Sequence, residues 1–83
     1  MNSEQLSQLL QQAFPHAEVH VTGQAGKFEL RIVDDGFEGK RTVARQQMVY
    51  APLNAHIASG VVHAVTIRAM TKEEWRKASM FGA

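Results

Sequence analysis

The sequence predicts an α/β domain of the α+β kind, with the element order α-β-β-α-β-α and a three-stranded mixed sheet that has helices on one face. Two observations carry this prediction. The spacing of hydrophobic residues changes from a helical period to alternation and back again along the chain. Glycine or proline falls at most of the points where the period changes, as expected for turns between elements. Because 83 residues have room for one hydrophobic core, we expect a single domain over residues 1–83.

The first element is predicted to be an amphipathic helix over residues 3 to 14. Asn2 or Ser3 can cap its start, and Pro15 ends it because proline cannot continue the helix cheaply. Its apolar stripe, at helical spacing, consists of Leu6, Leu9, Leu10, Ala13 and Phe14.

Two alternating segments then predict an antiparallel hairpin with one buried face. The run Gly23-Gln-Ala-Gly26 between them has the length and the residues of a hairpin turn. The apolar positions of the two strands are Val19, Val21, Phe28, Leu30 and Ile32. On the opposite face, a thin basic patch of Lys27, Arg31 and Arg68 is diluted by Glu18 and Glu29, and we interpret it as a solvated surface.

The second half of the chain returns to helical spacing over residues 42–57, where Pro52 predicts either a kinked helix or two short helices. Gly60 provides a stop, and a nearly all-apolar strand should run from Val61 to Ala69. The helical positions expected to face the core are Val43, Gln46, Val49, Tyr50, Leu53 and Ile57.

A final helix is predicted to begin with a capping box, in which Thr71 and Glu74 satisfy each other's backbone amides. Trp75 lies on its first turn and should anchor this helix to the sheet.

Composition argues against several classes of function. The chain has no cysteine, so it supplies neither disulfides nor thiolate ligands, which fits a reducing, cytoplasmic setting. No apolar run approaches the roughly 18 to 20 residues that cross a bilayer, and the first five residues lack the features of a signal peptide. The net charge of +1 is not typical of bulk electrostatic binding to nucleic acid. We expect no enzymatic activity, since the chain has no nucleophile elbow, phosphate loop or paired carboxylates.

His63 is the side chain whose chemistry the pattern leaves unexplained. Imidazole binds metals and changes charge near neutral pH. His63 shares strand parity with Val65 and Ile67, so it is either a partly buried histidine at the edge of the core or a metal ligand at its rim. The spacing leaves both interpretations open. His16 and His20 are four residues apart but lie outside the predicted helices, so no histidine pair has the helical i, i+4 arrangement of a zinc site. The three remaining histidines should be solvated: His16, His20 and His56.

The run Gly36-Phe-Glu-Gly39 is followed by Lys40 and Arg41. In KH domains a G-x-x-G loop lets the backbone approach nucleotide phosphates closely. Neighbouring acidic residues oppose such a role here, so we interpret the run first as a turn with Phe37 tucked inward. A nucleic-acid surface made of Lys40, Arg41 and Arg45 is the alternative hypothesis.

Four motifs, in order and covering essentially the whole chain, resemble the BolA-like proteins, and within them the IbaG branch. They are Phe37-x-Gly39, Arg45-Gln-Gln-Met-Val-Tyr50-Ala-Pro-Leu53, Val62-His63-Ala64-Val65-Thr66-Ile67 and Thr71-x-x-Glu74-Trp75. The resemblance implies a class II KH-like fold, which agrees with the element order predicted above.

The resemblance also implies a partner, a monothiol glutaredoxin, bound through a bridging [2Fe-2S] cluster or in a cluster-free complex. The implied roles are iron–sulfur trafficking, iron homeostasis or a stress response. His63 matches the cluster-ligating histidine of the family, while the glutaredoxin and its bound glutathione would supply thiolates. When free, the protein is expected to be a monomer or weak homodimer without a cluster.

The chain departs from the family pattern at one position. Family members commonly carry a second His or Cys just before the Phe of the second strand, and here that position is Lys27. His20, on the neighbouring strand, is a conjectural substitute ligand.

Some BolA-like proteins are described as DNA-binding regulators linked to stress and cell shape. The resemblance places that surface at residues 36–45, with Lys40 and Arg41. The near-neutral charge of this chain makes DNA binding the alternative function.

Overall fold

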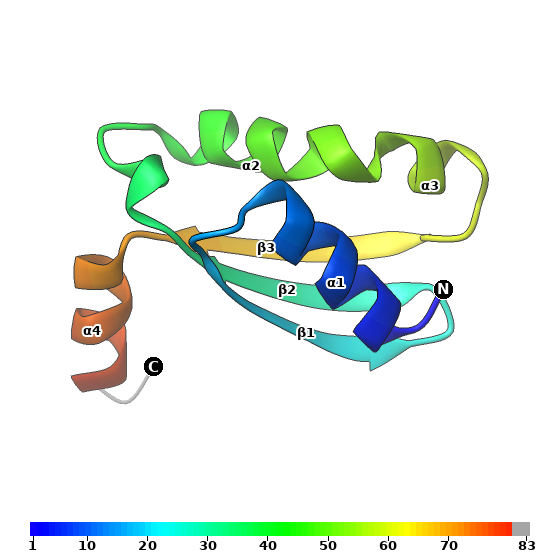
Figure 1. Ribbon diagram of the computed structural model, residues 1–83, viewed down its shortest axis with the longest axis horizontal. Coiled ribbons are helices and arrows are strands. Elements are labelled where there is room, and N and C mark those ends of the chain that lie inside the picture. The colour runs from blue at the N-terminus through cyan, green and yellow to red at the C-terminus, as the bar shows by residue number, and fades with distance from the viewer. Residues whose placement is uncertain (81–83) are drawn as a thin grey trace.

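The computed structural model describes residues 1–80 and confirms the predicted element order (Figure 1). Helix α1 spans Ser3–Ala13. Its start is a capping box, in which the Asn2 side chain accepts from the Gln5 amide at 2.8 Å and the Gln5 side chain accepts from the Asn2 amide at 3.0 Å. Leu6 and Leu10 are fully buried, and Leu9 and Phe14 pack against the core, so these four members of the predicted apolar stripe do face it. Ala13 is exposed, because it lies at the end of the helix.

The sheet has the order β1-β2-β3, with β2 in the centre. Strands β1 (Glu18–Gln24) and β2 (Lys27–Val33) are antiparallel, and β3 (Ala64–Met70) runs parallel to β2. The mixed sheet is therefore confirmed. Its inner face joins α1 and the middle helices in one core, whose buried members include Phe28, Leu30, Ile32, Phe37, Val49, Leu53 and Val62.

The hairpin turn is tighter than the sequence indicated. Gln24 still pairs with Lys27, so the turn contains only Ala25 and Gly26. Their φ angles are 55° and 79°. Two consecutive positive φ values are typical of a type I′ turn, whose twist matches that of the flanking strands.

The segment with Pro52 forms two short helices rather than one kinked helix. Helix α2 (Thr42–Tyr50) leads through a 3₁₀ turn, η2 (Ala51–Leu53), into α3 (Asn54–Ala58). Val43 does not face the core as predicted, since it is 65 % exposed. At 3.6 residues per turn, Val43 lies roughly 120° around the helix from the buried Val49, which explains the difference.

Strand β3 begins at Ala64, later than the predicted Val61. The amides of Val61 and Val62 both donate to the His56 carbonyl at 3.1 Å, so these residues close helix α3 instead of pairing with β2. Pairing starts where the amides of His63 and Ala64 donate to the Gly26 carbonyl.

Helix α4 (Lys72–Met80) starts with the predicted capping box between Thr71 and Glu74. Helices α1, α2 and α3 lie on one face of the sheet, whereas α4 projects beyond its end (Figure 1). The Trp75 ring packs under the guanidinium of Arg31, on the opposite, open face, so it does anchor the helix but from the other side. The described part of α4 is rich in charged residues and has little apolar surface to place in the core. None of the helices within residues 1–80 is long and apolar enough to cross a membrane.

Candidate functional site

His63 lies at a corner where the hairpin turn meets the start of β3. Its amide donates to the Gly26 carbonyl at 2.7 Å, and its ring rests on Gly26. A Cβ placed on Gly26 would overlap the His63 Cδ2 and would lie 3.1 Å from Cγ. His63 is exposed, so the prediction of a partly buried core-edge histidine is wrong. The reason is the late start of β3, which leaves His63 outside the alternation of the strand.

Lys27 lies at the same corner. It follows Gly26 directly, pairs in register with Ala64 and is exposed. The structure therefore places Lys27, the position at which the resemblance implies a second ligand, at the same corner as His63. A protonated ammonium has no lone pair to offer a metal, so the corner itself supplies one imidazole.

His20 does not share this corner. It pairs with Arg31, four residues along β1 from Gln24, and β2 separates its strand from β3. At about 3.3 Å per residue and about 4.8 Å per strand, His20 is more than 10 Å from His63. Metal–imidazole bonds are about 2.0–2.1 Å long, so His20 is not a substitute ligand beside His63. Within residues 1–80, no group of three or more His, Asp or Glu side chains could hold a metal ion.

The Gly36–Gly39 run is a turn with Phe37 inside, as predicted. Residues Asp35–Phe37 form a 3₁₀ turn, η1, whose start is capped by the Asp34 carboxylate at 2.9 Å from the Gly36 amide. Phe37 is fully buried, with its ring centroid 6.0 Å from that of Phe14. This loop is thus held by a hydrophobic anchor.

Of the three basic residues assigned to a nucleic-acid surface, Lys40 and Arg41 are exposed but Arg45 is not available. Arg45 donates from Nε to the Lys40 carbonyl (2.9 Å) and from Nη1 to the Ala69 carbonyl (3.1 Å). The guanidinium joins α2 to β3 and α4, which argues against a nucleic-acid contact at Arg45. Nucleic-acid binding by Lys40 and Arg41 stays a prediction.

The same guanidinium forms a two-pronged ion pair with Glu74, with Nη1–Oε1 at 2.6 Å and Nη2–Oε2 at 3.2 Å. The hydrogen bond from Arg45 holds the pKa of Glu74 below its ordinary value, with further help from the Thr71 amide. Glu74 therefore caps α4 and fixes Arg45 at once.

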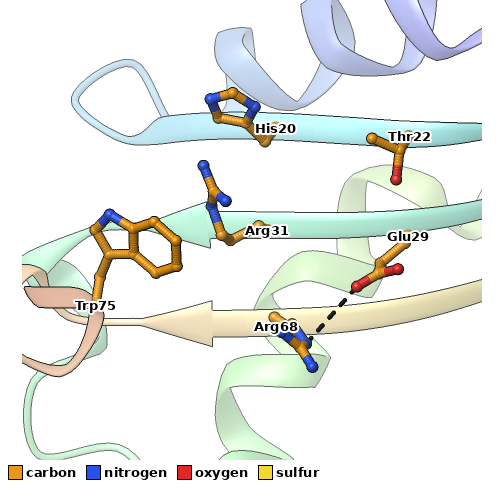
Figure 2. A pocket seen from close by; sticks show the side chains of 6 residues that line it. All are labelled: His20, Thr22, Glu29, Arg31, Arg68 and Trp75. Atoms are coloured by element: carbon orange, nitrogen blue, oxygen red, sulfur yellow. Dashed lines mark ion pairs between the residues drawn. The ribbon is translucent and has the colours of Figure 1, made fainter. Parts of the chain in front are cut away.

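On the open face of the sheet, the register reveals an arrangement that periodicity alone did not predict. His20 lies directly opposite Arg31, and Arg31 directly opposite Arg68. These three residues form a basic row, with one residue on each of the three strands, beside Trp75 (Figure 2). The sequence placed Arg31 and Arg68 on one face of the sheet, but only the register shows that both are aligned with His20.

We expect Gly26→Ala to displace the His63 ring and lower the free energy of unfolding by about 1–2 kcal/mol. Alanine at φ +79° is strained, and its Cβ would overlap the imidazole. Urea unfolding measures the loss, and the ¹H–¹³C correlation of the His63 ring measures the displacement.

The double variant Gly26→Ala/His63→Ala should recover part of this loss, because the overlap disappears while the backbone strain remains. Strictly additive effects of the two substitutions would contradict contact between the ring and the turn.

The fold and the corner together define a class of protein: a small α+β domain that exposes one histidine at the start of its third strand. The family model for BolA-like protein matches residues 5–74. The chain belongs to this family.

Three similar proteins illustrate the relationship. A protein of Acinetobacter guillouiae is 80% identical over 83 residues, covering all of both chains. The acid stress protein IbaG of Escherichia coli K12 is 38% identical over 77 residues, covering 93% of this chain and 92% of IbaG. The structure of a BolA homologue from Coxiella burnetii superposes with a TM-score of 0.80 at 23% identity, covering 92% of this chain and 97% of the homologue.

Proposed function

We propose that this chain is a cytoplasmic, non-enzymatic adaptor that pairs with a monothiol glutaredoxin in iron–sulfur trafficking, iron homeostasis or a stress response. The observation that carries the proposal is the exposed imidazole of His63, held at a defined corner of a BolA-like domain. The relative IbaG of Escherichia coli is an acid stress protein, which supports the stress branch of the proposal.

The metal-ligating side chains at this corner fit a shared [2Fe-2S] cluster in part. His63 would supply one ligand, and the remaining ligands would come from the glutaredoxin and glutathione, because this chain has no cysteine. The bound cluster would supply electron-transfer or cluster-transfer chemistry. This chain's own contribution is to fix the imidazole through the Gly26 turn and to leave it accessible. With Lys27 beside it, His63 would be the single ligand from this corner.

The test is to coexpress the chain with a monothiol glutaredoxin under iron supply and to record visible circular dichroism of the purified complex. We expect a cluster spectrum that His63→Ala changes or abolishes, since the exposed ring would be a ligand. His16→Ala, which also removes an exposed histidine, should leave the spectrum unchanged.

Two further measurements separate ligation from folding. His63→Ala should shift the stability of the free protein by less than about 0.5 kcal/mol, because the residue is exposed. Lys27→His should prolong cluster retention, because it places a second imidazole at the corner. A visible spectrum indifferent to His63→Ala would remove His63 from the ligand set.

A further inference from the structure

The basic row on the open face places like charges in direct register. Arg31 on β2 is the cross-strand partner of Arg68 on β3, and its other neighbour is His20 on β1. Like charges directly opposite one another destabilise a sheet unless something compensates them. The fold therefore maintains an arrangement that its own strands do not favour.

Arg31 lacks an acidic partner within the part of the chain that the structure describes. None of the ion pairs among residues 1–80 involves it, and its buried Nε has no hydrogen-bond acceptor. Its guanidinium carbon lies 4.0 Å from the centroid of the Trp75 ring, which holds it by a cation–π contact. Arg31 is thus positioned by packing while its charge is left uncompensated.

Arg68 is paired only weakly. Its Nε lies 3.7 Å from Glu29 Oε1, and both side chains are more than half exposed. Exposed pairs with such geometry contribute little, so Arg68 can exchange this contact for a better one.

The three side chains of the basic row line a hollow of about 220 Å³, together with Thr22, Glu29 and Trp75. Figure 2 shows the Arg31 guanidinium directed toward His20, with the Trp75 ring at its side. Two guanidinium groups, an imidazole and a hydroxyl outnumber the single carboxylate. The volume is below the roughly 300 Å³ at which pockets for drug-sized ligands begin, so the occupant must be small.

We propose that the basic row binds the oxyanion group, phosphate or carboxylate, of a small molecule. Arg31 supplies a preorganised fork for two oxygens, which guanidinium matches in geometry as well as charge. Arg68 and His20 flank it as further donors. The row is about 13 Å along the sheet from the His63 corner, by the rise of four strand residues between Ala64 and Arg68, so this site is separate from the proposed glutaredoxin contact.

Trp75, the only tryptophan of the chain, provides the reporter. The free protein is titrated at constant ionic strength with inorganic phosphate, acetate or sodium chloride. Trp75 fluorescence and the amide shifts of His20, Arg31 and Arg68 are recorded. We expect a saturable response to phosphate or acetate and none to chloride, and the stronger of the two responses identifies the group that the site prefers.

Arg31→Gln should weaken binding about 10- to 100-fold, as expected for the loss of a charged hydrogen-bonding partner. The matched control is Arg76→Gln, which removes an exposed arginine of α4 that does not line the hollow and should leave the affinity unchanged. Glu29→Gln leaves the Arg31–Trp75 contact intact and should tighten binding about two- to fivefold, which keeps the test decisive if Arg31→Gln does not fold.

Equal responses to chloride and phosphate, or equal affinities of Arg31→Gln and Arg76→Gln, would overturn the proposal. Unchanged or weaker binding by Glu29→Gln would also overturn it. Saturable binding of a poly-glutamate peptide alone, without a response to phosphate or acetate, would replace the small molecule by an acidic protein partner.

Discussion

Replacing Arg45 by methionine should lower the free energy of unfolding by about 2–3 kcal/mol. Arg45 is 13 % exposed at its side chain and donates to two carbonyls and one carboxylate that come from three different segments. Methionine keeps most of the apolar stem but leaves the Ala69 carbonyl without this donor. This hydrogen bond is partly buried, and an acceptor that loses its partner away from water costs about 1–3 kcal/mol. Urea unfolding followed by far-ultraviolet circular dichroism measures the change.

The control for this substitution is Arg76→Met. Arg76 also pairs with a glutamate, Glu73, at 2.9 Å, but its side chain is 63 % exposed. An exposed pair of this kind contributes less than about 1 kcal/mol. Equal losses for Arg45→Met and Arg76→Met would show that the contacts of Arg45 do not stabilise the fold.

The ion pair between Arg45 and Glu74 should also make the free energy of unfolding depend on pH in a defined direction. Because the pKa of Glu74 is lower in the folded protein than its ordinary value of 4.5, the folded state favours the ionised carboxylate. The stabilisation is fully present above about pH 4.5 and is lost as the pH falls toward the lowered value. The stability difference between the wild type and Glu74→Gln should therefore shrink as the solution is acidified below pH 4.5.

Phe37→Ala should cost about 3–5 kcal/mol, the usual loss for removing a buried aromatic ring. Phe37 is fully buried and lies in the main hydrophobic core, near Phe14. Domains of this size have a total stability of roughly 4–12 kcal/mol. A substantial unfolded fraction at 37 °C is the expected result, and thermal denaturation measures it.

Two control substitutions show whether the loss of stability in Phe37→Ala comes from removing the buried ring. Phe37→Leu keeps much of the volume and should cost clearly less than alanine. Val43→Ala, on an exposed position of α2, should change stability by less than about 0.5 kcal/mol. A small effect of Phe37→Ala would mean that the η1 turn is not anchored by its aromatic ring.

Local chemistry made most of the fold predictable. The caps at Asn2 and Thr71, the break at Pro52 and the inward Phe37 all depend on neighbours within a few residues, and the structure confirms each of them. The alternation in β2 likewise identified its buried face.

The candidate sites were less predictable because they depend on register and on contacts between distant segments. No local pattern indicated that Val62 would close α3 and leave His63 outside the strand. The same holds for Arg45, whose partners on β3 and α4 are far away in the sequence. The basic row required knowledge of which residues face one another across three strands.

The Gly26 carbonyl receives the amides of two consecutive residues, His63 at 2.7 Å and Ala64 at 3.0 Å. These hydrogen bonds close a long loop, because the hairpin lies early in the sequence and β3 follows it only after four helical segments, η1, α2, η2 and α3. Loop closure of this kind carries an entropic cost that only the assembled sheet repays. The place of His63 therefore depends on the docked parallel strand. A chain whose third strand is not docked lacks both hydrogen bonds, so a partner that recognises the ordered His63 ring would bind the folded protein only.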